Sequence, residues 1–211
     1  MDRQEIIVKV KLRLDELGPF EEGQVVDSGR IDHYLNDSVK RLLMIVPPYI
    51  PTPTSFSDDS SNGGSGTPTE NSSNDDGTGY IILPDDFVRF VALKMNCWKR
   101  TVTTAMSEND PRYARQSNPF IRGSADKPIV VYRSEPGVGK VLEYYSVRNA
   151  NHAIDRGLYL AACVAEDLDE ELVDPLSWLV AETILNTVGE FELAKAANAK
   201  LMEWINMRAV I

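Results

Sequence analysis

The sequence lacks the features that define exported, membrane-spanning and metal-binding proteins. No window approaches the ~18 consecutive apolar residues that a membrane span needs, and the N-terminus has no signal-peptide core. We therefore expect a cytoplasmic chain without a membrane partner. Two cysteines, Cys97 and Cys163, allow at most one disulfide, and we expect both to be reduced thiols. The only histidines, His33 and His152, have no cysteine or carboxylate in ligand spacing, so the sequence predicts no metal site.

Motifs for catalysis and cofactor binding are also missing. Residues 137–140 (Gly-Val-Gly-Lys) resemble the end of a phosphate-binding loop, but the earlier glycine and the following Ser or Thr are absent. Acidic residues gather between 166 and 174 without the glycine and ligand spacing of a calcium loop. Neither histidine is accompanied by a serine nucleophile and an orienting acid. The sequence therefore predicts no catalytic residues, no cofactor and no enzymatic activity.

Positive charge is scarce and unevenly spread. The formal net charge is −10, from 22 Lys and Arg against 32 Asp and Glu. Residues 80–149 carry 11 basic and 7 acidic side chains, whereas residues 150–211 carry 4 and 11. Such an acidic chain offers no general surface for neutralising DNA phosphates. An acidic surface can let a DNA duplex move past without adhering, or it can simply keep the chain soluble. The opposite segment charges can also attract neighbouring copies of the chain, and these interpretations stay open here.

Helical periodicity marks both ends of the chain. We predict helices over about residues 2–17, 31–46, 175–188 and 190–207. Pro47 and Pro48 end the second helix, and Asp174 followed by Pro175 is typical of an N-cap and a first helical position. The apolar face of the last helix, including Phe191, is expected to pack against a partner helix. A short amphipathic helix cannot bury its apolar face alone, so we expect these four helices to form one bundle.

A polar segment separates the first two helices from the rest. Residues 51–79 contain one aromatic residue, Phe56, and no Val, Ile, Leu or Met. Such a segment has almost no apolar area to offset an ordering entropy of ~1–2 kcal/mol per residue. We predict a flexible insertion within one domain, and not a linker, because the helices before it are too few to form a core.

Between residues 80 and 149 the periodicity becomes that of strands. Strands are predicted over residues 80–83, 87–95, 101–104, 128–133 and 140–147. The last two form a hairpin, because Pro136 and Gly137 supply the chemistry of a turn. A short helical turn is predicted from Asp110 through Gln116. The fold class is α+β: a single domain, 1–211, in which a helical bundle formed by the N- and C-terminal helices holds a small inserted antiparallel β unit, 80–149.

Three tryptophans can be core or contact residues. Trp178 and Trp204 occupy helical positions where core packing explains them. Trp98 follows a predicted strand and precedes the basic pair Lys99 and Arg100. It can belong to the core, or it can anchor a protein interface, where Trp and Arg are enriched.

One segment resembles a known family. The run Leu83-Pro84-Asp85-Asp86-Phe87, continued by Lys94 and Trp98-Lys99-Arg100, resembles the head-to-tail adaptor proteins of tailed phages. The likeness is to the tail tubular or tail accessory proteins of short-tailed phages and the ring proteins of crAss-like phages. The order of elements agrees over nearly the whole chain except the polar insertion. By this resemblance, the interface residues would be Leu83, Pro84, Asp85, Asp86, Phe87, Trp98, Lys99 and Arg100.

The resemblance implies a structural virion protein of a bacteriophage. It would form a ring of about twelve identical subunits at the portal–tail junction, connecting the capsid portal to the tail. Its partners would be itself, the portal protein and other tail or ring proteins. The chain would be made in the host bacterial cytoplasm, and DNA would pass through the channel during ejection without specific binding. The alternative is a cytoplasmic, non-enzymatic protein-binding module that uses the Trp98 region or a sheet edge.

Overall fold

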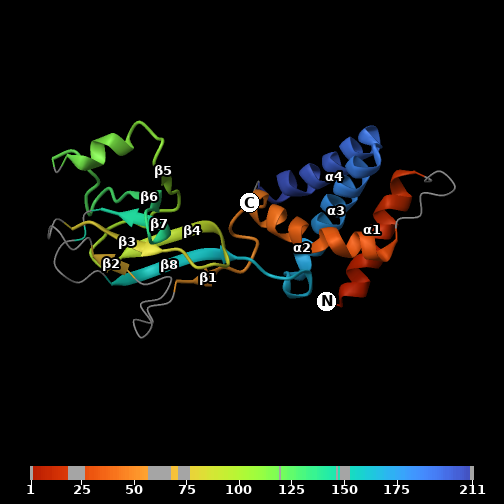
Figure 1. The fold of residues 1–211 in the computed structure, drawn as a ribbon, viewed down its shortest axis with the longest axis horizontal. Helices are drawn as coiled ribbons and strands as arrows, with labels where there is room; N and C mark the ends of the chain where they lie inside the picture. Colours follow the sequence, from red (N-terminus) through yellow and green to blue (C-terminus); the bar gives the residue numbers. More distant parts are fainter. Residues whose placement is uncertain are drawn as a thin grey trace. The chain divides into compact units, whose positions relative to one another are not determined.

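A computed structural model describes residues 2–18, 27–56, 68–70, 77–118, 120–145, 147 and 153–209. The chain forms two compact units (Figure 1). Met1–Thr52 and Ala162–Ile211 make one, here called the helical unit, and Pro53–Ala161 makes the other, the β unit. The predicted α+β class is confirmed, because helices from both ends of the chain enclose an inserted β unit in the sequence.

The helical unit is built around one central helix. Its helices are α1 (Arg3–Leu17), α2 (Ser28–Ile45), α3 (Val173–Val188) and α4 (Phe191–Ala209). Two short helical turns, η3 (Ala165–Asp167) and η4 (Glu170–Leu172), come directly before α3. Helix α3 packs against each of the other three helices. All of its side chains from Leu176 to Ala181 are buried, as expected where a central helix is covered by its neighbours.

Two predictions about residues at the ends of the helices were wrong. Asp174 was expected as the N-cap of α3, but the helix begins at Val173 because η4 already curves the chain before it. The Asp174 carboxylate instead accepts a hydrogen bond from Arg13 of α1. Phe191 was expected to face a partner helix, but it is exposed in the first turn of α4, just after Gly189 ends α3 in a left-handed conformation (φ 90°).

The β unit contains two sheets, where one antiparallel sheet was predicted. The first has the order β1-β8-β4, from Thr54–Ser55, Ile154–Ala161 and Phe87–Met95. The second has the order β2-β3-β7-β6-β5, from Pro68–Glu70, Gly79–Ile82, Gly139–Tyr144, Val130–Glu135 and Met106–Ser107. β5 pairs with β6 in parallel, so the second sheet is mixed. The hairpin β6–β7 lies where it was predicted, whereas β8 lies beyond the predicted β unit.

Part of the predicted flexible insertion is ordered against β8. The Phe56 ring is buried and stacks on Tyr159, with 4.8 Å between centroids. Gly157 allows this approach, since a Cβ at that position would come within 2.8 Å of Phe56. Most of the insertion, residues 57–67 and 71–76, lies outside the described residues. The predicted strand 101–104 is reduced to a single bridge, between Val102 and Leu93.

Candidate protein-docking surface

The segment that carries the family resemblance forms the turn between β3 and β4. The Phe87 N–H donates to the Pro84 carbonyl (3.0 Å) and closes the turn. Leu83 and Phe87 pack against the core of the β unit. The Tyr159 hydroxyl donates to the Asp86 carboxylate (3.2 Å), while Asp85 is exposed. Structural contacts thus account for most of this segment, and Asp85 and Asp86 are its exposed side chains.

The second predicted segment, Trp98 to Arg100, lies beyond the other end of β4. A nine-residue strand separates the two segments by about 25 Å, so they do not form one compact site. The Trp98 side chain is only 3% exposed and meets Tyr144 edge-on in the core, so it lies beneath the surface. Lys99 and Arg100 are exposed. The Lys99 N–H donates to the Ala125 carbonyl (2.9 Å), which ties this segment to the base of a neighbouring loop.

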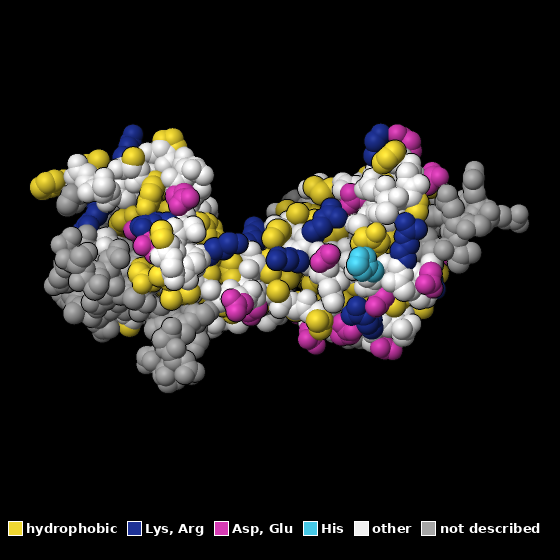
Figure 2. Space-filling view, in the orientation of Figure 1, with side chains coloured by type: hydrophobic (Ala, Val, Ile, Leu, Met, Phe, Trp, Pro, Cys, Tyr) yellow, Lys and Arg dark blue, Asp and Glu magenta, His cyan; other side chains and the backbone are white. Residues whose placement is uncertain are grey.

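That neighbouring loop, residues 108–129 between β5 and β6, carries the most exposed aromatic side chain among the described residues. Phe120 is 95% exposed, and Ile121 beside it is also exposed. Figure 1 shows the loop standing off the sheet of β5, β6 and β7, and Figure 2 shows hydrophobic and basic side chains on it. From 111 to 125 the sequence has three arginines and no acidic residue. An exposed aromatic among arginines is typical of a protein contact surface.

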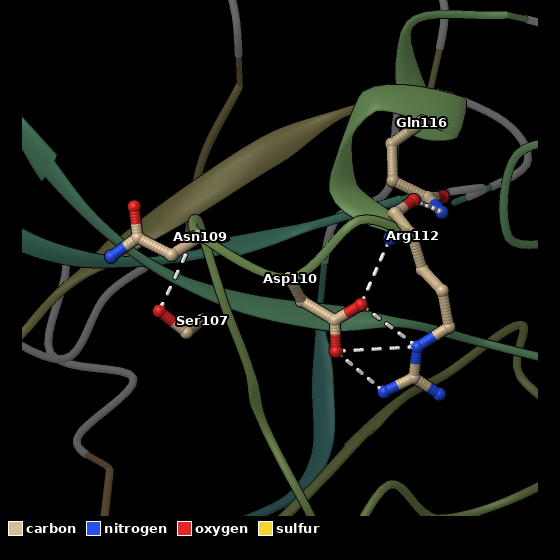
Figure 3. Close-up of polar contacts among 5 residues, drawn as sticks. All are labelled: Ser107, Asn109, Asp110, Arg112 and Gln116. Atoms are coloured by element: carbon tan, nitrogen blue, oxygen red, sulfur yellow. Dashed lines mark hydrogen bonds and ion pairs between the residues drawn. The ribbon is translucent and has the colours of Figure 1, made fainter.

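Polar contacts shape the first half of this β5–β6 loop (Figure 3). The Asp110 carboxylate accepts a hydrogen bond from the Arg112 backbone N–H (2.8 Å). The Arg112 guanidinium turns back onto the same carboxylate, with 2.7 Å between Nη2 and Oδ2. An aspartate that accepts from the backbone two residues later initiates a turn. The short helix η2 (Tyr113–Ser117) therefore begins directly after this contact.

A buried glutamine joins the two arms of the loop. Gln116 Nε2 donates to the Arg112 carbonyl (3.0 Å), and the Gly123 N–H donates to Gln116 Oε1 (2.9 Å). Glycine suits position 123, since a Cβ there would come within 3.2 Å of the Ile129 side chain. A buried amide that is satisfied at both ends fixes the arms relative to each other.

A buried carboxylate anchors the loop to the sheet. Glu143 on β7 accepts a hydrogen bond from the Tyr113 hydroxyl (3.1 Å) and pairs with Arg133 of β6 (3.3 Å). Burial and then the Glu143 carboxylate raise the pKa of Tyr113 and of Tyr145. Both hydroxyls therefore stay protonated at neutral pH, as hydrogen bonds to a carboxylate require.

The tip of the loop is also ordered by its own backbone. Asn118 Oδ1 accepts from the Phe120 N–H (3.0 Å), and the Asn118 carbonyl accepts from the Arg122 N–H (3.0 Å). Phe120 is therefore presented on a turn with defined hydrogen bonds. The sequence prediction of a short helical turn covered the base of the loop and missed its tip. The available signal was the apolar pair Phe120 and Ile121 in an otherwise polar stretch.

We expect the Asp110 carboxyl to titrate unusually low. Hydrogen bonds from the Arg112 side chain and backbone lower its pKa to about 2. Because the pKa is lowered by folding, the contact stabilises the turn above the ordinary pKa of 3.8 and is lost as pH falls through about 2. An NMR titration of Asp110 checks this midpoint. Arg112→Gln should return the pKa toward 3.8, and an unchanged midpoint in that variant would contradict the assigned cause.

The other candidate motifs lie in structural positions. Residues 137–140 form the tip of the β6–β7 hairpin and the start of β7. Carboxylates of the 166–174 cluster tie the helical unit together: Glu166 pairs with Arg3 (2.9 Å), and Glu171 pairs with Arg208 (3.0 Å). Within the described ranges, no three or more His, Cys, Asp and Glu side chains are grouped to hold a metal ion. His152 lies outside these ranges.

Neither the comparisons with known proteins nor the search for membrane-spanning helices among the described residues gave a match. No model of a known protein family matches the sequence, and no curated protein matches it significantly. None of the helices in the described parts of the chain combines the length and apolarity that a bilayer span requires.

Proposed function

We propose that the chain is a structural virion protein that forms a ring at the portal–tail junction of a bacteriophage. It connects the capsid portal to the tail and lines or surrounds the channel through which DNA is ejected. It performs no catalysis, and its partners are copies of itself, the portal protein and other tail or ring proteins. The resemblance at Leu83–Arg100 and the order of elements, with a β unit inserted between two pairs of helices, support this proposal.

The observation that carries the proposal is the presence of two complementary surfaces on one chain. The helical unit contains 10 basic and 19 acidic residues in its sequence. The β unit contains 12 basic and 13 acidic residues in its sequence, and its β5–β6 loop presents three arginines together with the exposed Phe120. In a ring, each subunit meets its neighbours through two different surfaces. Opposite charges on those surfaces fix the direction in which subunits associate, so this chain is suited to head-to-tail closure.

The acidic balance also suits a channel for DNA. Surface carboxylates repel phosphates, so a duplex can move past such a wall without adhering to it. The net charge of −10 is thus compatible with a protein that surrounds DNA and does not bind it specifically.

Reconstitution with the portal protein of the same genome tests the proposed function. Co-expressed full-length chain and portal should give a complex in which electron microscopy shows a ring of this chain on the portal. Purified virions should contain the chain by mass spectrometry. Raising the salt concentration should weaken ring formation if opposite charges orient the subunits.

The contrary results are equally specific. Virions without the chain, or a portal that binds none of it at low salt, would refute the ring proposal. A one-to-one complex with an unrelated protein, with no binding to portal, would favour the non-enzymatic binding module, because the exposed Phe120 loop could serve that function as well.

A further inference from the structure

We propose that the tip of the β5–β6 loop docks on the outer face of α1 in a second copy of the chain. The docking tip consists of Phe120 and Ile121, with Arg115 and Arg122 beside them in the loop. This inference rests on the proposed ring and assigns one of its subunit contacts. Its partner is a second copy of this polypeptide, because a ring of identical subunits repeats the same pair of surfaces at every junction.

Helix α1 has an apolar strip on the side that faces away from its own core. Its buried side chains, Ile6, Ile7, Val10 and Leu14, lie on one side of the helix. Val8 and Leu12 are 55% and 54% exposed and follow each other by one turn on the opposite side. Two such side chains one turn apart form a continuous apolar strip that can receive an aromatic ring.

Acidic residues lie at both ends of this strip. Glu5 precedes Val8 by three positions, and Asp15 follows Leu12 by three positions, so all four share one helix face. The nearby lysines are partly buried, and Lys11 donates to the Ser28 hydroxyl (2.8 Å). The α1 face therefore offers apolar contact area between two carboxylates.

Asp15 occupies a position that is unfavourable for the helix itself. The last turn of α1 contains no basic residue, and the helix dipole disfavours negative charge there. Glu16 is compensated by Arg13 (2.8 Å), whereas the Asp15 side chain is exposed to a partner. An arginine from a second copy would compensate this charge.

The loop tip carries the matching chemistry. It is apolar at Phe120 and Ile121, and the arginines near them in sequence are positive. Phe120 would cover the Val8–Leu12 strip, while Arg115 would approach the Asp15 carboxylate. The Glu143, Gln116 and Asn118 contacts hold the loop before docking, so little entropy is lost on binding. Aromatic residues and arginine are enriched at the buried centres of protein interfaces.

Disulfide trapping between two full-length variants tests the contact. Both carry Cys97→Ser and Cys163→Ser, and circular dichroism confirms their folds. One then carries Ile121→Cys, beside Phe120 in the loop tip, and the other carries Gln4→Cys, one turn before Val8 on α1, so that Phe120, Val8 and Leu12 stay intact. Their mixture should form a covalent heterodimer about tenfold faster than a control mixture in which Val138→Cys replaces Ile121→Cys. Val138 is exposed at the β6–β7 hairpin and is a matched control. Equal rates would overturn the proposal.

A single chain that carries both new cysteines tests whether the loop tip docks on a second copy of the chain. Intermolecular dimers and larger products are expected from this double variant. A predominantly internal disulfide in a monomer would overturn docking between copies.

Exchanging the charges of Arg115 and Asp15 tests their proposed pairing, with the trapping rate as the measurement. Arg115→Glu in the loop partner, or Asp15→Lys in the helix partner, should each slow trapping about fivefold, and the pair together should restore it. Lys140→Glu, at an exposed site of the hairpin, should leave the rate unchanged. Slowing by both single variants without restoration would contradict the pairing of Arg115 with Asp15.

Failure of this inference can be separated from failure of the proposed function. A chain that forms rings on portal but shows no preference for trapping through Ile121→Cys and Gln4→Cys would refute the loop contact and leave the ring proposal standing. Specific trapping together with absence from virions would support the contact and refute the proposed function.

Discussion

Glu143→Ala is expected to lower the free energy of unfolding of the β unit by about 3 kcal/mol. Glu143 is 6% exposed, accepts from Tyr113 and pairs with Arg133. Without the carboxylate, the partly buried Tyr113 hydroxyl loses its acceptor, and the Arg133 guanidinium keeps only Glu135 as its partner. Arg133 can still reach water, which keeps the loss at the lower end for a broken buried pair. Chemical denaturation, followed by hydrogen exchange of the β6 and β7 amides, measures the change.

Two variants separate burial from charge in this prediction. Glu143→Gln keeps an acceptor oxygen and should cost only about 1 kcal/mol. Glu135 pairs with the same Arg133 but is about one-third exposed, so Glu135→Ala should cost less than about 1 kcal/mol. Equal losses for Glu135→Ala and Glu143→Ala would show that burial is not the cause. Exchange should also accelerate at the Gly123 amide in Glu143→Ala, because the loop loses its anchor.

Local sequence patterns predicted the elements whose structure is determined by residues that lie close together in the chain. Helical spacing placed all four helices to within about three residues of their observed ends. The β6–β7 hairpin was predictable because its turn chemistry and its alternation lie in one short stretch. The polar composition before residue 80 predicted a flexible insertion, but its described parts include the strands β1 and β2 and the buried Phe56.

Contacts between distant residues account for the elements that were missed. β8 is interrupted by Asp155, Arg156 and Gly157, so its sequence alone does not read as a strand. It forms because β4, some sixty residues earlier, pairs along it, and because Phe56 packs at Gly157. Trp98 could not be assigned to core or surface, because its burial depends on Tyr144 on β7.

The candidate site also depends on contacts between residues that are distant in the sequence. The sequence directed attention to Leu83–Phe87 and Trp98–Arg100 through a family resemblance, and the structure shows many of these side chains in turns and core. The Phe120 loop is held to the sheet by Glu143, which lies more than twenty residues later. A local pattern can show an apolar pair beside arginines, but it cannot show that the pair is held out toward solvent.

Trp178→Ala is expected to lower the free energy of unfolding of the helical unit by about 4 kcal/mol. The Trp178 side chain is buried on α3, and the Arg13 guanidinium of α1 lies over its ring, 4.8 Å from the centroid. Truncation removes a large buried surface and also the stacking partner of Arg13. Urea unfolding followed by far-ultraviolet circular dichroism, to which helices contribute most, measures this loss.

Trp204 provides the matched comparison. It also lies beneath an arginine, Arg208 at 5.4 Å, but it is only partly buried, so Trp204→Ala should cost about 1–2 kcal/mol. Equal losses for the two variants would show that burial does not set the difference. Because Arg13 helps to hold α1 against α3, Trp178→Ala should also slow trapping between Gln4→Cys and Ile121→Cys, although Trp178 is not part of the proposed contact.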